Sequence, residues 1–104
     1  MIKRAIEGDA EELACLAVLL WNNHGVEELR DEFADMLKSD EAACFIAYES
    51  DVSVGFAQCL LRHDYVEGTT TSPVGYLEGI YVMPEYQNHR LAKQLLGACE
   101  SWAR

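Results

Sequence analysis

Carboxylates beside aromatic rings are the side chains in this sequence whose types and spacing could do chemistry. Asp64 and Glu67 flank Tyr65 in a loop-like stretch, and Glu78 interrupts an otherwise apolar run. Carboxylates attract ammonium ions, a ring face adds cation–π attraction, and a carboxylate can accept the proton that an amine loses. The pattern indicates a site for a cationic amine, with Glu78 as the first candidate for a base.

Each of these carboxylates also has a simpler interpretation. Glu67 lies where a turn residue is expected, and Asp64 could cap the same loop locally. An unpaired charge inside an apolar strand is costly, so Glu78 is either a functional group or a residue on the wet face of an edge strand. Two nearby histidines, His63 and His89, have no role that their positions in the sequence indicate.

Trp21 and His24 follow the first expected helix and are candidates of a second kind. On periodicity, Trp21 is either a core residue or a ring on which a ligand stacks. His24 is either a residue favoured by the helix dipole near a C-terminus, which is the more common role, or a functional group. Both alternatives stay open at this point.

A strand that runs into a polar loop and then an apolar helix occupies residues 76–96, YLEGIYVMPEYQNHRLAKQLL. This order aims several backbone N–H groups of a helix N-terminus at one point, where a phosphate binds with little help from side chains. The signal is weak by itself, because every strand–helix unit contains one.

Within this stretch, the acetyl-CoA signature V-x-P-x-x-[QR]-x-x-G-x-[GA] is matched at Val82, Pro84, Gln87 and Ala92. The chain therefore resembles the GCN5-related N-acetyltransferases (GNAT). Arg90 stands where that family usually has glycine. Its side chain either crowds the CoA pyrophosphate or adds a cationic contact to it.

Three further segments resemble the aminoglycoside 6'-N-acetyltransferases within that family: RHDYVEG, YLEGIYV and the LW-x-x-H element. The resemblance implies acetyl-CoA as cosubstrate and a cationic amine as acceptor. The implied acceptor site consists of Trp21, His24, Asp64, Tyr65 and Glu78. The implied CoA site consists of the strand backbone at Ile80, Tyr81 and Val82, followed by Gln87, Asn88, His89, Arg90, Leu91 and Ala92.

The resulting hypothesis is an acetyl-CoA-dependent N-acetyltransferase that acts on the 6'-amine of an aminoglycoside, as antibiotic-resistance enzymes do. Glu78 would act as the base through a water, and backbone near Tyr81 and Val82 would polarise the thioester. The family's proton donor to the leaving thiolate is a tyrosine in a C-terminal part that these 104 residues lack. One alternative is a non-catalytic GNAT-like module that binds cationic ligands or pairs with another chain. A third is acetylation of a protein N-terminus or another amine.

The elements that must position these residues follow from apolar periodicity and from turn residues. Strands are expected at 1–6, 42–48, 52–62 and 75–82, and helices at about 9–21, 26–38 and 88–102. The short connection through residues 49–51 implies an antiparallel hairpin between the second and third strands. The predicted fold is mixed α/β, an incomplete GNAT fold of order β-α-α-β-β-β-α with a mainly antiparallel sheet. It forms one domain over residues 1–104, without the family's usual C-terminal strands and helix.

Three local features refine this prediction. Asp9 and Glu12 form a D-x-x-E pattern that is expected to cap the first helix. Gly55, inside a strand, predicts a bulge or a close backbone approach. The strand at 75–82 would be an exposed apolar edge, so we expect a homodimer or a swapped assembly that covers it.

Composition limits the partners. Eight Lys and Arg against eighteen Asp and Glu give a net charge of −10. This charge repels nucleic acid and anionic membranes and attracts polycations, although better solubility is the plainer explanation. Cys15, Cys44, Cys59 and Cys99 lack metal-site spacing, so no metal is expected. They are predicted to be reduced core residues of a cytoplasmic protein, and no signal peptide or membrane span is recognised.

Overall fold

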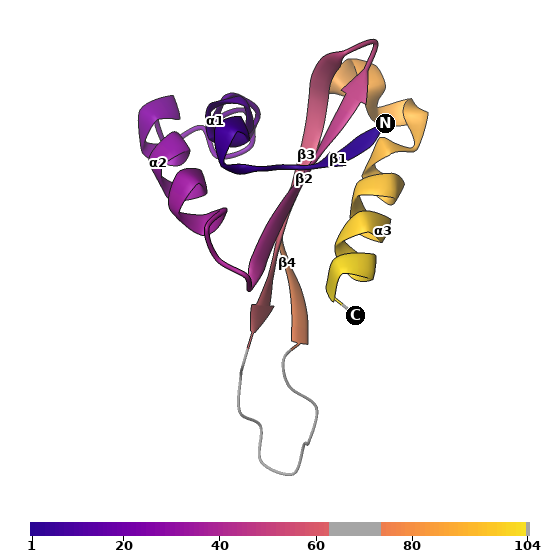
Figure 1. Cartoon of the computed structure of the whole chain (residues 1–104). Coiled ribbons are helices and arrows are strands. Elements are labelled where there is room, and N and C mark those ends of the chain that lie inside the picture. Colours follow the sequence, from indigo (N-terminus) through magenta and orange to yellow (C-terminus); the bar gives the residue numbers. More distant parts are fainter. Residues whose placement is uncertain (63–73, 104) are drawn as a thin grey trace.

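The computed structural model describes residues 1–62 and 74–103. Four strands, β1 (Ile2–Arg4), β2 (Ala42–Glu49), β3 (Val52–Arg62) and β4 (Val74–Val82), form one antiparallel sheet in the order β1-β2-β3-β4. Helices α1 (Ala10–Ala17) and α2 (Val26–Met36) lie on one side of the sheet, and α3 (Leu91–Ala103) lies on the other (Figure 1). The predicted mixed α/β fold and its order of elements are confirmed.

Two apolar layers hold the helices to the sheet. Successive residues of a strand point to opposite faces, so β2 and β3 supply side chains to both layers. On the α1–α2 side, the Phe56 ring is fully buried and meets Trp21 and Phe33 edge-on, with ring centroids 6.0 and 6.1 Å apart. On the α3 side, Leu91 and Leu95 pack into the second layer. Coverage of both faces explains why β2 is almost continuously apolar.

The β2–β3 connection is a two-residue hairpin. Glu49 pairs with Val52, and the intervening Ser50 and Asp51 have φ angles of 51° and 68°. Two successive positive φ angles are typical of the turn whose twist matches that of paired strands. The expected antiparallel hairpin is therefore confirmed.

Gly55 in β3 lies where only a hydrogen atom fits. A Cβ at this position would stand 2.7 Å from the backbone oxygen of Tyr81 on β4. The β2–β3 register also shifts beside it, and Val54 is the extra residue. Both predicted features, the close approach and the bulge, are present.

The predicted start of the chain is wrong in two details. α1 ends at Ala17 and not near residue 21, and Leu20, which lies within the expected helix, is 38% exposed. Asp9 is the N-cap residue of α1 as predicted, but its side chain makes no capping hydrogen bond to that helix, because Oδ2 accepts the backbone N–H of Ile6 at 2.9 Å and so closes the preceding helical turn. Glu12 instead accepts the hydroxyl of Tyr48 at 2.9 Å.

Two further corrections concern the last helix and the cysteines. The last helix begins at Leu91 and not at Asn88, because Arg90 has a φ of 60°, which a right-handed helix cannot accommodate. Cys15 is exposed and is not a core residue, whereas Cys44, Cys59 and Cys99 are buried as expected. Across the part of the chain that the structure describes, no helix has the length and apolarity that a bilayer crossing requires.

Candidate active site

A hollow of about 210 Å³ opens on the α1–α2 side of the sheet, next to β3 and β4. We call it the acidic hollow, because two carboxylates line it together with an indole, an imidazole and an amide. Its lining residues are Trp21, His24, Leu29, Glu32, Gln58 and Glu78. Three of the expected acceptor-site residues, Trp21, His24 and Glu78, therefore lie around one cavity.

A bulge in β4 turns Glu78 toward this hollow. Gln58 pairs with Gly79 and Cys59 pairs with Leu77, so Glu78 is the extra residue between the two pairs. In a regular strand Glu78 and Gly79 would face opposite sides. The bulge lets both of them face the α1–α2 side, Glu78 at the acidic hollow and Gly79 against the ring of Trp21, while Leu77 lines a cavity on the α3 side.

Glu78 is exposed and lies on an edge strand of the sheet. The simpler interpretation, a carboxylate on the solvent-exposed face of an edge strand, therefore describes its exposure correctly. The charge is not buried, so burial gives no argument for a function of Glu78. The bulge distinguishes it, because bulges often re-aim a side chain next to an active site. The proposed catalytic role thus rests on direction and not on burial.

Trp21 is at once a packing residue and a wall of the hollow. Its ring meets Phe56 at an interplanar angle of 68°, and Gly79 passes directly beneath it. A Cβ on residue 79 would lie 2.7 Å from Cζ2 of Trp21. The two interpretations of Trp21 are therefore not exclusive, since the half-buried indole packs with one part and lines the hollow with another.

Replacing Gly79 by alanine is expected to raise KM for an acceptor amine about tenfold, because the new methyl displaces the indole from the hollow. Steady-state kinetics with varied acceptor measure this effect. Gly97→Ala is the matched control, since a Cβ at residue 97 meets nothing within 4 Å. An unchanged KM in the Gly79 variant would show that the position of Trp21 does not matter to the acceptor.

His24 stands before α2, not at the C-terminus of a helix. α1 ends seven residues earlier, at Ala17, and Gly25 is the N-cap of α2. The dipole interpretation is therefore wrong, because a helix N-terminus does not favour a cation. The ring is held instead by Glu28, whose Oε1 lies 2.7 Å from Nδ1 of His24.

Glu32 and Gln58 also line the acidic hollow, although neither was expected there from the sequence. Glu32 lies three residues after Leu29 on α2, a helical spacing that places both at the hollow. Gln58 is a polar residue within the apolar run of β3, and its Nε2 lies 3.2 Å from Sδ of Met36. That interruption was a usable signal of the same kind as Glu78. The structure does not describe three further residues that the sequence indicates as candidates: Asp64, Tyr65 and Glu67.

At the end of β4, the main chain and not the side chains is accessible to a ligand along the edge of the sheet. Ile80 and Val82 pack into the layer under α3, and Tyr81 packs into the layer under α1 and α2. β4 is also the edge of the sheet, and within residues 1–62 and 74–103 no strand pairs with its outer side. Backbone N–H and C=O groups of this segment are therefore what a ligand along the edge would meet.

A helical turn, η2 (Pro84–His89), joins β4 to α3. Nε2 of Gln87 donates to the carbonyl oxygen of Val82 at 3.1 Å and ties this turn to the strand end. The carbonyl of Arg90 accepts the N–H of Gln94 at 3.1 Å, so the α3 ladder starts there. The N–H groups at Leu91 and Ala92 thus belong to the first turn of a helix, where anions bind. The buried side chain of Leu91 leaves only its backbone for such a role.

Replacing Arg90 by glycine is expected to raise the free energy of unfolding by about 1 kcal/mol, because left-handed backbone costs an L-residue about 1–2 kcal/mol and glycine regains part of it. Urea denaturation measures this difference. Arg90→Ala keeps the strain and removes only the charge. If only the glycine variant binds CoA more tightly, the Arg90 side chain crowds the pyrophosphate. If both variants bind CoA more weakly, the Arg90 side chain makes a cationic contact to it. A less stable glycine variant would contradict the strain argument.

The chain is similar to known proteins of one family. Residues 10–104 match the sequence profile of the acetyltransferase (GNAT) family. An aminoglycoside N(6')-acetyltransferase type 1 from Stenotrophomonas maltophilia is 41% identical over 104 residues, which is 99% of this chain and 67% of the relative. The Salmonella typhimurium protein of the same name is 41% identical over 83 residues, covering 80% of this chain and 57% of the relative.

Solved structures of aminoglycoside N-acetyltransferases have the same fold as this chain. The aminoglycoside N-acetyltransferase AAC(6')-Iy in complex with CoA superimposes with a TM-score of 0.88 at 36% identity, over 98% of this chain and 67% of that one. The same enzyme with a CoA-linked bisubstrate analogue gives a TM-score of 0.87. The chain thus spans between 57% and 69% of the length of these relatives. Because the sequence profile covers nearly the whole chain and the fold agrees, the chain belongs to the acetyltransferase (GNAT) family.

Proposed function

We propose that this chain is an acetyl-CoA-dependent N-acetyltransferase domain whose acceptor is the 6'-amine of an aminoglycoside. The observation that carries the proposal is the bulge that aims Glu78 at a hollow walled by Trp21, on the same strand that leads to the turn before α3. The names of the relatives and their complexes with CoA and a bisubstrate analogue support the same chemistry.

The acceptor would enter the acidic hollow as a polycation. A net charge of −10 raises its local concentration, and Glu32 and Glu78 provide two carboxylates at the cavity itself. The proposed acceptor site consists of Trp21, His24, Asp64, Tyr65 and Glu78. The two added lining residues, Glu32 and Gln58, complete the wall that the structure describes.

The cosubstrate supplies an acetyl thioester, and this chain's residues would position it. The outer edge of β4 at Ile80, Tyr81 and Val82 offers backbone groups to the pantetheine chain and to the thioester oxygen. The phosphates would face the turn and the start of α3 (Gln87, Asn88, His89, Arg90, Leu91 and Ala92).

Proton transfer is assigned to Glu78. The acceptor ammonium loses a proton through a water to this carboxylate, and the freed nitrogen attacks the carbonyl carbon. The N–C bond forms and the C–S bond breaks, and the nitrogen then releases its second proton, which the leaving thiolate takes up. None of the four thiols is needed as a nucleophile.

The proposal is tested by thiol release from acetyl-CoA with two aminoglycosides, one with a 6'-amine and one with a 6'-hydroxyl. Turnover with the amine alone is the expected result. No turnover with either, in a sample whose circular dichroism shows a folded chain, would favour the alternative of a module that binds cations without catalysis. Turnover with many unrelated amines would favour a broader acetyltransferase.

We further infer a homodimer in the cytoplasm. β4 is the edge of the described sheet and exposes Tyr76 and Leu77, which gives a second chain both hydrogen-bonding groups and apolar surface. The four cysteines are free thiols, which supports a reducing compartment. Light scattering at micromolar concentration should give twice the chain mass, and a monomer would refute the dimer.

A further inference from the structure

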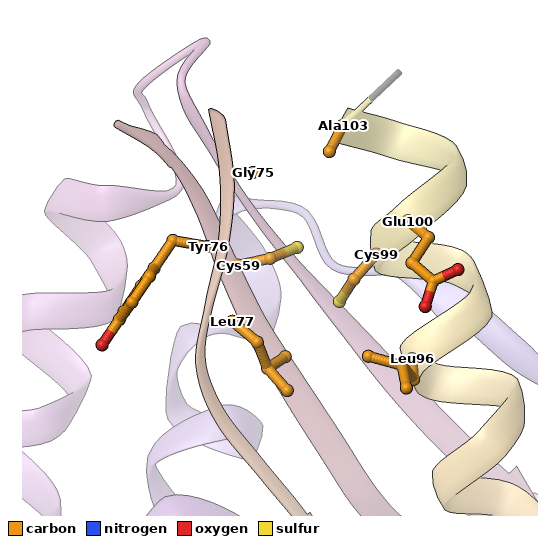
Figure 2. Close-up of a pocket in the computed structure, with 8 residues that line it drawn as sticks. All are labelled: Cys59, Gly75, Tyr76, Leu77, Leu96, Cys99, Glu100 and Ala103. Atoms are coloured by element: carbon orange, nitrogen blue, oxygen red, sulfur yellow. The ribbon is translucent and has the colours of Figure 1, made fainter. Parts of the chain in front are cut away.

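A second cavity, on the opposite side of the sheet from the acidic hollow, lies between β4 and α3 (Figure 2). It has a volume of about 170 Å³ and a mainly apolar lining. The lining residues are Cys59, Gly75, Tyr76, Leu77, Leu96, Cys99, Glu100 and Ala103. Two thiols, which the acetyl transfer does not use, are thus exposed to one cavity.

The two thiols face each other. Cys59 on β3 and Cys99 on α3 point toward one another in Figure 2, and both line the cavity. They are 3% and 5% exposed, so the cavity is their route to small solutes. The Cys59 thiol donates a hydrogen bond to the carbonyl oxygen of Ala43, with Sγ and O 3.4 Å apart.

The closeness of the two thiols makes the pair unequal. A hydrogen bond that the Cys59 thiol can donate lowers the pKa of Cys99 by stabilising its thiolate, and the same interaction, together with burial, raises the pKa of Cys59. The thiolate is the form that attacks oxidants, so Cys99 is the more reactive of the two. Burial raises the pKa of Cys44, which lies in the other apolar layer and does not line this cavity.

We propose that Cys59 and Cys99 are a two-electron redox site that small peroxides convert into a disulfide between β3 and α3. The Cys99 sulfur attacks a peroxide oxygen, the O–O bond breaks, and a sulfenic acid and one water form. The Cys59 sulfur then displaces the hydroxyl group, forming the S–S bond and a second water. Two thiols and one hydrogen peroxide thus give one disulfide and two waters.

Size and topology suit this step. A cavity of about 170 Å³ holds a molecule of hydrogen peroxide with ease, since a water occupies only about 30 Å³ of liquid. The bond would fasten α3, which follows the proposed phosphate-binding turn, to the centre of the sheet. A cross-link between segments this far apart in the chain also restricts the unfolded state, so Tm should rise by about 10 °C.

The test uses the full chain carrying Cys15→Ser, which removes the exposed thiol and with it intermolecular disulfides. After hydrogen peroxide and alkylation, intact mass should show the loss of two hydrogen atoms, reversed by dithiothreitol. Cleavage at Glu49 separates Cys44 from Cys59, so peptide mapping identifies the linked pair. Circular dichroism melting measures the rise in Tm.

Adding Cys99→Ser or, in a second variant, Cys59→Ser should abolish both the mass change and the shift in Tm. Two independent variants keep the test valid if one of them fails to fold. The proposal is overturned if both thiols remain free while peroxide oxidises free cysteine in the same tube. It is equally overturned by a disulfide to Cys44, or by sulfinic acid on Cys99 without a disulfide. None of these readouts depends on acetyl transfer.

Discussion

The Glu78→Gln variant is expected to lose at least about 100-fold in kcat for acetylation of a 6'-amine, with a smaller change in KM for the acceptor. General bases typically contribute about 10²–10⁴-fold, and the amide keeps the size of the side chain but cannot accept the proton. The exposure of Glu78 and its place in a bulge imply that Tm stays unchanged. Steady-state kinetics and thermal melting measure these two quantities.

Glu27→Gln is the matched control, because Glu27 is exposed on α2 and does not line the acidic hollow. It removes the same charge from the chain, so it reports the loss of long-range attraction alone. Equal kcat values in the two variants would remove Glu78 from the mechanism. A rise in KM alone for the Glu78 variant would make this residue a binding group and not a base.

The second large effect is on stability. Phe56→Ala is expected to lower the free energy of unfolding by about 3–5 kcal/mol, the usual loss for a buried phenylalanine that leaves a cavity. The ring is fully buried and forms edge contacts with both Trp21 and Phe33. Such a loss is a large part of the stability of a small domain, which is about 5–15 kcal/mol. Urea denaturation measures it.

The same substitution should also loosen the site, because the edge contact to Phe56 holds the indole of Trp21. Phe56→Leu is the control. It keeps most of the buried volume and should lose less than half as much stability. If Phe56→Ala lost less than about 1 kcal/mol, the aromatic cluster would not be the part of the core that positions Trp21.

The sequence alone was enough to predict the elements and their order. Apolar periodicity located α2 and the strands, and the short connection at Ser50 and Asp51 predicted an antiparallel hairpin that the structure confirms. These are local properties, since a few neighbouring residues determine a turn or an amphipathic face. The signature around Val82 and Gln87 was likewise readable, because it lies within one continuous stretch.

The local sequence pattern gave wrong predictions where the backbone conformation or the burial of a side chain depends on tertiary packing. The left-handed φ of Arg90 moved the start of α3, and no helix propensity of the neighbouring residues indicated it. Cys15 and Cys99 both lie in apolar helices, yet one thiol is exposed and the other meets Cys59. Which face of a helix is buried depends on the partner that covers it.

Only the tertiary structure decided which way the candidate residues point. A shift of one residue in strand pairing moves a side chain to the other face of the sheet, and the pairing of β4 with β3 involves residues far apart in the sequence. The bulge at Glu78 is such a shift, and it brings this carboxylate to Trp21 and Gln58. The sequence by itself therefore determined which groups are present and on which elements. The register between distant strands determined which of them share a site.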